Sequence, residues 1–446
     1  MKRMAFVEME QWKTSTNRKP LLIRGARQVG KTYLVRQLGE QFENFVEINL
    51  EYLQKSKKIF EYDLDPHRIT RELSVLTGKK IIPGKTLLFL DEIQEAPQAI
   101  SSLRYFYEIV PEQHVIAAGS LLEFELGKIG MPVGRVSSLY IYPLSFLEFL
   151  KAREEELLVE ALIDNSPSIA INEAIHQKAL RILGEFMAVG GMPEAVAAWI
   201  NSEDLKNCSK INHTIIETYR QDFNKYVEKY QVKYVELLFN TLPVFQGKKF
   251  KFNNIPGEYR KRDLQPALEL LIKAGIAHRI IHSKGTGIPL WSEADPENFK
   301  INFLDVGLSQ SILGADRGSW ILEPDVYFAN KGQLTEAFVG QEFLAYSLAD
   351  KKGELFYWNR EARSSNAEVD YLLQKKDHIL PIEVKSGSPG HLKSLQLFLQ
   401  THNSSPQGIR FSSQNFAIDN HIHSYPLYAV FKLIPPDPDV LRSFLS

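Results

Sequence analysis

The stretch from residue 25 to residue 32 carries residue types that bind phosphate. It reads GARQVGKT and fits the pattern G-x-x-x-x-G-K-[ST] at every fixed position. Glycines let backbone N–H groups wrap around phosphate oxygens, the lysine reaches the β and γ oxygens, and the threonine hydroxyl coordinates Mg²⁺. We therefore predict an ATP and Mg²⁺ site in which Lys31 is also catalytic and Thr32 is a metal ligand. The predicted nucleotide-binding residues are Gly25, Ala26, Arg27, Gln28, Val29, Gly30, Lys31 and Thr32.

Two later segments supply polar residues directly after apolar runs. Asp91 and Glu92 follow the apolar residues 86–90, which is typical of a strand buried on both faces. We predict that Asp91 holds the metal and that the Glu92 carboxylate orients or deprotonates the attacking water. Ser120 follows a second apolar run and is either a sensor of the γ-phosphate or part of a simple Gly-Ser turn.

A second set of acidic residues and a lysine lies near the end of the sequence. In LPIEVKSG, residues 380–387, the two-residue period of a strand puts Glu383 and Lys385 on the same face. Carboxylates that hold metal ions, together with a lysine that stabilises developing charge, are what phosphodiester cleavage requires. The alternative is the edge of a solvated sheet. A preceding strand with Asp370 and a helix with Glu336 supply further carboxylates, so the predicted metal ligands are Glu336, Asp370 and Glu383, and the predicted catalytic residues are Asp370, Glu383 and Lys385.

The elements around these residues indicate an α/β fold. Apolar residues 21–23 predict a strand before the glycine-containing loop, and Leu34, Val35 and Leu38 mark one side of a helix after it. This context argues against an accidental glycine turn. Residues 332–350 predict the helix that carries Glu336, and a hairpin would bring Asp370 beside Glu383.

The middle of the sequence is locally basic. Residues 225–262 contain nine basic side chains and three acidic ones (Glu228, Glu236, Glu258). An amphipathic helix that ends near Gly275, followed by short apolar strands, fits a winged-helix unit. Phosphate contacts to nucleic acid would explain the charge, and a solvated face is the alternative. The basic residues are Lys225, Lys229, Lys233, Lys248, Lys249, Lys251, Arg260, Lys261 and Arg262.

Whole-chain properties exclude several classes of protein. The 446 residues have a net charge of −1 and one cysteine, so an internal disulfide framework is excluded and a reducing compartment is expected. The sequence contains no apolar run long enough to span a bilayer, and acidic residues come too early for a signal peptide. We expect a cytoplasmic protein with no membrane partner.

The motifs together resemble a known protein family. GARQVGKT, FLDEIQ, AAGSLL and GRVSSLYIYPLSFLEFL are similar to the AAA+ ATPase module that bacterial and archaeal proteins carry together with a C-terminal domain of unknown function. The resemblance implies that Arg135 is a candidate sensor or finger, although a lone arginine is more often a salt-bridge residue. The element Gly190, Gly191, Pro193 and Glu194 also matches the family, as does the segment around Asp305, which is most simply a turn or helix-cap residue.

The order of the C-terminal elements resembles the PD-(D/E)xK nuclease core. The expected fold is therefore α/β, with a P-loop NTPase parallel sheet, a helical lid, a central winged-helix-like segment and a C-terminal restriction-endonuclease-like domain. The expected domains are 1–160 (ATPase core), 161–205 (lid), 206–300 (basic linker domain) and 301–446 (nuclease-like domain).

Two classes of function are compatible with these observations. The first is an ATP-driven module that loads or controls a DNA nuclease. The second is a nucleotide-dependent switch whose C-terminal domain is a catalytically inactive module that binds protein or DNA. The expected partners are ATP, DNA or another nucleic acid, and a homo-oligomer of this chain.

Overall fold

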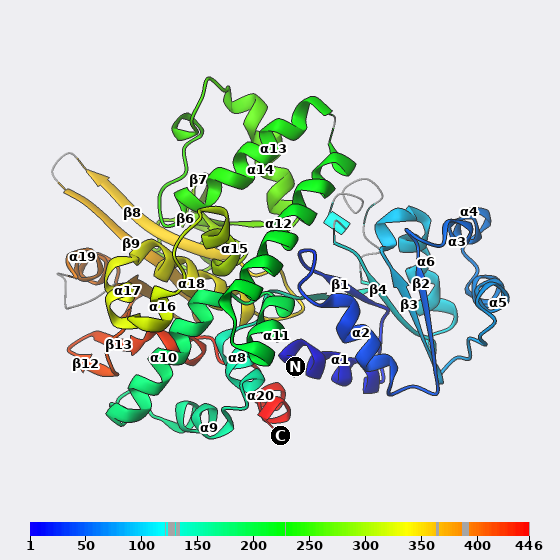
Figure 1. The fold of residues 1–446 in the computed structure, drawn as a ribbon, viewed down its shortest axis with the longest axis horizontal. Helices are drawn as coiled ribbons and strands as arrows, with labels where there is room; N and C mark the ends of the chain where they lie inside the picture. Colours follow the sequence, from blue (N-terminus) through cyan, green and yellow to red (C-terminus); the bar gives the residue numbers. More distant parts are fainter. Residues whose placement is uncertain are drawn as a thin grey trace. The chain divides into compact units, whose positions relative to one another are not determined.

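The structure is a computed structural model that describes residues 1–120, 122–123, 130, 134–227, 229–362, 365–385 and 392–445. The chain forms two compact units (Figure 1). The first unit consists of Lys2–Tyr142, Leu348–Lys352 and Asp437–Ser446, and the second consists of Met1, Pro143–Ser347 and Gly353–Pro436. Compactness does not test the four predicted domains, whose boundaries at residues 160, 205 and 300 stay predictions.

The first unit is built on a five-stranded sheet in the order β2-β3-β4-β1-β5. Every neighbouring pair is parallel. The central strands β3 and β4 are buried along their whole length, as the continuous apolar runs predicted. The strands are β1 (Leu21–Arg24), β2 (Asn44–Asn49), β3 (Thr86–Asp91), β4 (His114–Ala118) and β5 (Ser137–Tyr140).

Helices of the first unit pack apolar side chains against this sheet. Phe60, Ile69, Leu103 and Phe106 join the buried cluster that contains Leu88 of β3. The helices that contribute to this cluster are α4 (Ile59–Tyr62), α5 (Pro66–Thr77), η1 (Ile93–Glu95) and α6 (Pro97–Ile109). Two further helices of this unit are α2 (Lys31–Gly39) and α3 (Gln54–Lys57).

Two distant segments of the chain return to complete the first unit. Helix α20 (Pro438–Leu445) packs on α1 (Met4–Thr14), where Val7, Val440 and Phe444 form a small buried cluster. Figure 1 shows the two helices beside each other. In addition, the backbone N–H of Tyr140 in β5 donates a hydrogen bond of 2.7 Å to the carbonyl of Ala349. The first unit is therefore assembled from three separate stretches of sequence.

The second unit is built on an eight-stranded mixed sheet in the order β12-β13-β11-β10-β9-β8-β6-β7. The pairs β10–β11, β11–β13 and β6–β8 are parallel and the other pairs are antiparallel. The strands are β6 (Ala277–Ser283), β7 (Ala294–Phe303), β8 (Leu355–Ala362), β9 (Ser365–Gln374), β10 (Ile379–Val384), β11 (Gly408–Ser412), β12 (Ala417–Asp419) and β13 (Ile422–Pro426).

One helix of the second unit lies in its interior. Every residue of α18 (Gly332–Ala345) from Thr335 to Leu344 is buried, so this helix has no solvated face.

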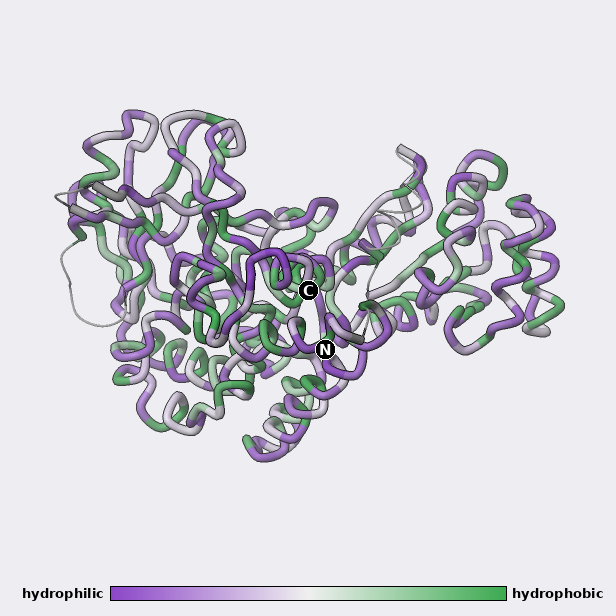
Figure 2. The backbone as a smooth tube through the Cα atoms, turned by 90° about the horizontal axis from the view of Figure 1, so that it is seen from above, coloured by the Kyte–Doolittle hydropathy of each residue, from purple (hydrophilic) through white to green (hydrophobic). Residues whose placement is uncertain are grey.

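In the coloured tube, apolar and polar stretches alternate along the chain (Figure 2). The remaining helices are α8 (Phe146–Ala152), α9 (Glu156–Asp164), α10 (Glu173–Val189), α11 (Pro193–Ser202), α12 (Leu205–Tyr226), α13 (Lys229–Thr241), η2 (Leu242–Phe245), η3 (Phe252–Asn254), α14 (Lys261–Lys273), η4 (Leu290–Glu293), α15 (Val306–Ile312), α16 (Ser319–Leu322), α17 (Pro324–Asn330), α19 (Lys393–Thr401), η5 (Leu427–Lys432).

The segment expected to be a winged helix is organised differently. The predicted helix exists as α14, and strands β6 and β7 follow it as an antiparallel pair. This pair extends the large sheet, because Ile280 of β6 pairs with Leu355 of β8. A separate winged-helix unit is therefore not confirmed.

Among the helices that the structure describes, none is both long and apolar enough to cross a lipid bilayer.

The two family elements around Gly191 and Asp305 contact each other. Asp305 is fully buried, caps α15 by accepting a 2.9 Å hydrogen bond from the N–H of Leu308, and accepts a second of 2.6 Å from the N–H of Gly191. Gly190 has a φ of 86°, and a Cβ there would lie 2.4 Å from Asp305 Oδ1. The helix-cap role predicted for Asp305 is confirmed, and the close approach explains the glycine.

We expect Asp305→Ala to lower the free energy of unfolding by about 2 kcal/mol or more. The substitution removes a helix cap and leaves two buried N–H groups without an acceptor. Urea unfolding followed by tryptophan fluorescence measures the change. Asp325→Ala, which alters an exposed acid at the start of α17, is the matched control and should change the value by less than about 0.5 kcal/mol. Equal effects of the two variants would contradict this account of Asp305.

Candidate nucleotide site and acidic cluster

The glycine-containing loop between β1 and α2 has the backbone shape that its sequence requires. Gly25 and Gly30 have φ values of 144° and 96°, in the region that favours glycine. A Cβ on Gly25 would lie 2.2 Å from the carbonyl oxygen of Ile141, so no larger residue fits without a shift of the backbone. Gln28 also has a positive φ, of 63°. This loop ends where α2 begins, at Lys31.

The Lys31 side chain is buried at the centre of this loop. Its Nζ donates hydrogen bonds to the carbonyl oxygens of Gly25, at 3.0 Å, and Ala26, at 2.7 Å. Burial lowers the pKa of Lys31 to about 8, while the nearby Glu92 and Asp91 carboxylates act in the opposite direction. The ammonium group is therefore mostly charged at neutral pH, and its partners are neutral carbonyls.

The structure places Thr32 and Asp91 next to each other. Thr32 Oγ1 lies 3.4 Å from both Oδ1 and Oδ2 of Asp91, at the ends of α2 and β3 that meet at the loop. Burial, followed by the Glu92 charge, raises the pKa of Asp91 to about 6. A hydroxyl and a carboxylate at this distance fit the oxygen ligands that Mg²⁺ prefers.

Glu92 has a partner that the sequence analysis missed. Its Oε2 accepts a 2.6 Å hydrogen bond from Nε2 of Gln94, and its φ of 50° turns the chain sharply after β3. Gln94 is buried, and a Cβ on Gly119 would lie 2.1 Å from Gln94 Oε1. Gln94 therefore connects Glu92 with the segment after β4, where Ser120 is also buried. The only signal in the sequence is its place in the DEIQ segment.

Arg135 forms an exposed ion pair. Its Nε donates to Oε1 of Glu108 at 2.8 Å, and the arginine side chain is 45% exposed. The contact matches the salt-bridge alternative considered for this residue. The sensor or finger role stays a prediction.

Three residues of the predicted acidic cluster meet at the carboxyl end of β10. Lys385 Nζ lies 2.5 Å from Oε1 of Glu383. Asp370 of β9 accepts a 2.7 Å hydrogen bond from the backbone N–H of Val384, which ties the two strands together at this point. The second oxygen of Glu383, Oε2, is buried and has no hydrogen-bond partner within the part of the chain that the structure describes. The hairpin that was predicted to bring these residues together is present.

Two further residues of this cluster were not predicted. Lys300 of β7 is completely buried, and its Nζ lies 2.9 Å from Oε1 of Glu336, 2.6 Å from Oε1 of Glu368 and 3.7 Å from Oδ1 of Asp370. The signal for Lys300 is weak, because a lysine flanked by apolar residues in FKINF also fits an ordinary half-buried strand. The two-residue period of a strand, which paired Glu383 with Lys385, also puts Glu368 on the face of Asp370 and was the signal that could have found it.

The protonation of the cluster follows from burial and charge. Burial raises the pKa of Glu336 to about 8, against the effect of Lys300, and burial together with Asp370 raises the pKa of Glu383 to about 7. Burial alone would lower the pKa of Lys300, but Glu336, Asp370 and Glu368 together raise it well above the usual value. Lys300 is therefore charged throughout the physiological range of pH.

With Lys300 in place, the acidic cluster does not fit a divalent metal ion. Within the described ranges, no three His, Cys, Asp or Glu side chains are placed so that they could hold a metal. The ammonium group of Lys300 lies where the carboxylates of Glu336, Glu368 and Asp370 approach one another. The metal-ligand roles of Glu336, Asp370 and Glu383 stay predictions.

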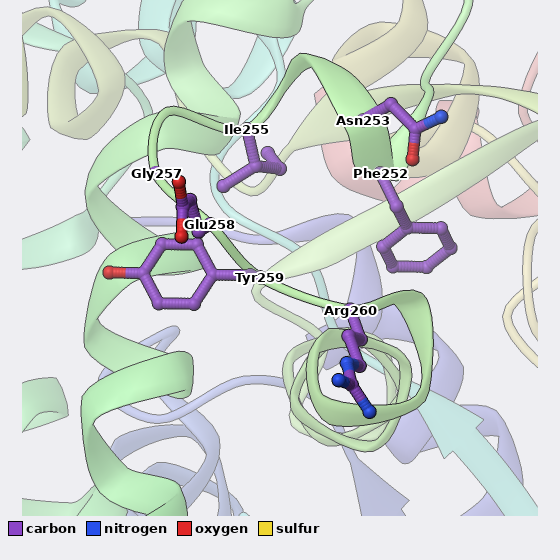
Figure 3. A pocket seen from close by; sticks show the side chains of 7 residues that line it. All are labelled: Phe252, Asn253, Ile255, Gly257, Glu258, Tyr259 and Arg260. Atoms are coloured by element: carbon purple, nitrogen blue, oxygen red, sulfur yellow. The ribbon is translucent and has the colours of Figure 1, made fainter.

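Residues 252–260, near the end of the basic segment, line an open pocket of about 470 Å³ in the second unit. The rings of Phe252 and Tyr259 lie on two sides of this pocket, and the Arg260 side chain extends from the chain between them (Figure 3). Lys248 and Lys251 are exposed nearby in sequence, and Lys261 forms an ion pair of 2.8 Å with Glu297. Glu228, one of the acidic residues counted in this segment, lies outside the described residues. The remaining lining residues are Asn253, Ile255, Gly257 and Glu258.

Comparison with solved structures gives several matches of low identity. A Walker-type ATPase of Pyrococcus abyssi is 16% identical with a TM-score of 0.42, over 69% of this chain and 94% of that chain. The ORC1 protein of Aeropyrum pernix, solved in complex with DNA, is 13% identical with a TM-score of 0.26, over 70% and 91%. The Hsp104–ADP complex of S. cerevisiae is 10% identical with a TM-score of 0.27, over 76% and 43%. No curated protein matches the chain.

Comparison with protein-family models divides the sequence into three parts. A model described as an AAA domain matches residues 17–150. Models described as domains of unknown function match residues 180–319 (DUF8612) and 331–430 (DUF4143). The chain therefore carries an AAA-family ATPase domain, built around the loop at Lys31, together with a C-terminal DUF4143 domain of unknown function.

Proposed function

We propose that this protein is an ATP-hydrolysing module that acts on nucleic acid through its nuclease-like C-terminal domain, which binds without cutting. The observation that carries the ATPase part is the convergence of Lys31, Thr32, Asp91 and Glu92 where α2 begins and β3 ends. Phosphoryl transfer depends mainly on positioning and charge neutralisation, and these four side chains supply both.

Each of the four side chains has a distinct role in this proposal. Lys31 exchanges its two carbonyl partners for the β and γ phosphates, because charge-assisted hydrogen bonds are the stronger ones. Thr32 and Asp91 would hold Mg²⁺, which supplies charge neutralisation at the phosphates when it is bound. Glu92 orients the attacking water once its carboxylate leaves the amide of Gln94.

The pocket in the basic segment supports nucleic acid as the partner. Exposed lysine and arginine side chains gain affinity for phosphates through release of counterions, and the rings of Phe252 and Tyr259 offer faces on which bases can stack. The segment also comes close to the acidic cluster, because a Cβ on Gly247 would lie 2.8 Å from Glu336 Oε2. Lys248 follows this glycine directly.

A second candidate function is strand cleavage by the C-terminal domain. The order α18-β8-β9-β10-α19-β11 is that of the predicted nuclease-like core. Glu383 beside Lys385 has an oxygen without a hydrogen-bond partner among the described residues, which favours a reactive site. We favour binding without cleavage over strand cleavage because Lys300 lies among the carboxylates.

We expect Lys31→Ala to weaken ATP binding roughly 10- to 100-fold, because the charged hydrogen bonds to the phosphates are lost. Glu92→Gln should keep ATP affinity but reduce hydrolysis about 10²- to 10⁴-fold, as for loss of a general base. Fluorescent-nucleotide titration and phosphate release measure the two effects. Lys85→Ala removes an exposed ion pair with Glu43 and serves as the control. Tight ATP binding by Lys31→Ala would remove the basis for the site.

Replacing Lys248, Lys249 and Lys251 together by Glu should weaken DNA binding and reduce the slope of log K against log salt concentration by about 2 to 3. Fluorescence anisotropy with labelled single-stranded DNA over a range of salt concentrations measures the slope. The control replaces three exposed lysines of the first unit, Lys79, Lys80 and Lys85, in the same way. An unchanged slope in the first variant would assign these lysines to a solvated face.

Incubation of the wild-type protein with Mg²⁺ or Mn²⁺ should leave plasmid and single-stranded DNA intact, because Lys300 occupies the cation position. Glu383→Gln should then behave identically on gels. Strand breaks that disappear in Glu383→Gln would instead establish the second candidate.

A further inference from the structure

Lys300 is an unusual residue for its position in the fold. It lies in β7, its side chain is fully buried, and its neighbours Ile301 and Phe299 are buried apolar residues. Carrying a charged ammonium group into such a place is costly unless opposite charges and hydrogen bonds compensate. Its nitrogen contacts carboxylates from two different elements, α18 and β9.

Strand pairing fixes the backbone of Lys300, and side-chain contacts fix its ammonium group. Lys300 pairs with Ile280 of β6 on one side of β7 and forms a bridge with Lys249 on the other. The ammonium group also lies 5.3 Å from the centre of the Tyr357 ring, which adds a cation–π contact. A lysine fixed in this way cannot withdraw into solvent as a surface lysine would.

The oxygens around Lys300 are of the kind that binds hard divalent cations. Glu336 and Asp370 are carboxylates predicted as metal ligands, and Glu368 adds a third. An independent observation is that Glu383, whose side chain is only 7% exposed, has a buried oxygen, Oε2, that finds no hydrogen-bond partner among the described residues.

We propose that the ammonium group of Lys300 is a built-in counter-ion that takes the cation position between Glu336, Glu368 and Asp370, and thereby keeps a divalent metal ion out of the cluster. This proposal rests on the function proposed above and explains why the domain binds without cutting. Lys300 belongs to β7, which is not one of the elements of the nuclease-like core. In this proposal, a residue from outside that core determines whether the cluster can bind a metal ion.

The test is to remove the ammonium group and to measure Mn²⁺ binding by the full chain. All variants carry Asp91→Asn and are studied without nucleotide, so that the first unit does not contribute a metal site. Lys300→Met keeps the length of the side chain, and we expect it to bind Mn²⁺ at least ten-fold more tightly than the parent in titration calorimetry. Its melting temperature should also rise with Mn²⁺ concentration, because a ligand that binds only the folded state stabilises it.

Lys375→Met is the matched control. Lys375 is another partly buried lysine of the second unit, but its Nζ donates to the carbonyl of Leu433 and contacts no carboxylate of the cluster. This variant should bind Mn²⁺ like the parent. A folded Lys300→Met protein whose Mn²⁺ affinity equals that of Lys375→Met would overturn the proposal.

A second variant decides the question if Lys300→Met does not fold. Glu336→Gln, made with Lys300 in place, should leave Mn²⁺ binding unchanged, because Glu336 already forms an ion pair with Lys300. A loss of Mn²⁺ affinity of ten-fold or more in this variant would show that metal reaches Glu336 and would overturn the proposal. DNA binding by the wild-type chain is measured separately, and its absence would count against the proposed function while leaving the Mn²⁺ result valid.

Discussion

A charge removed from water needs an opposite charge or a set of hydrogen-bond partners, and both units of this protein are organised around a lysine that meets this requirement. In the first unit the partners of Lys31 are the carbonyl oxygens of Gly25 and Ala26, which are neutral and belong to its own loop. In the second unit the partners of Lys300 are ionisable carboxylates from other elements. The first lysine can exchange its partners for a more highly charged ligand, whereas the second is already neutralised.

The parts of the structure that depend on local sequence were predictable. The strands β1 and β3, the loop at Gly25 and the start of α2 follow from apolar runs and glycines whose meaning is fixed within a few residues. The pairing of β9 with β10 was also predictable, because a hairpin needs only a short turn. As expected, Asp91 lies at the end of β3, and Asp370 and Glu383 lie on the paired strands β9 and β10.

The features that escaped prediction depend on contacts between distant parts of the chain. The strands expected to form a wing after α14 are β6 and β7, and they lie at the edge of the large sheet because Ile280 of β6 pairs with Leu355 of β8. No local sequence pattern predicts a pairing between such distant residues. Lys300 and Glu336 are separated along the sequence and lie on a strand and a helix, so their contact is a property of the packed unit. Gln94 is close to Glu92 in sequence, but only the turn at Glu92 reveals that the two side chains meet.

The return of the chain to the first unit matters for anyone who divides this protein into fragments. A polypeptide ending at residue 142 would lack both α20, which covers Val7, and the segment that supplies the carbonyl of Ala349 to β5. Its sheet would keep an open edge and its first helix would expose apolar side chains, two features that promote aggregation. The AAA domain matched at residues 17–150 is thus smaller than the compact unit to which it belongs, and we expect a stable ATPase fragment to need the last helix, either covalently linked or added as a peptide.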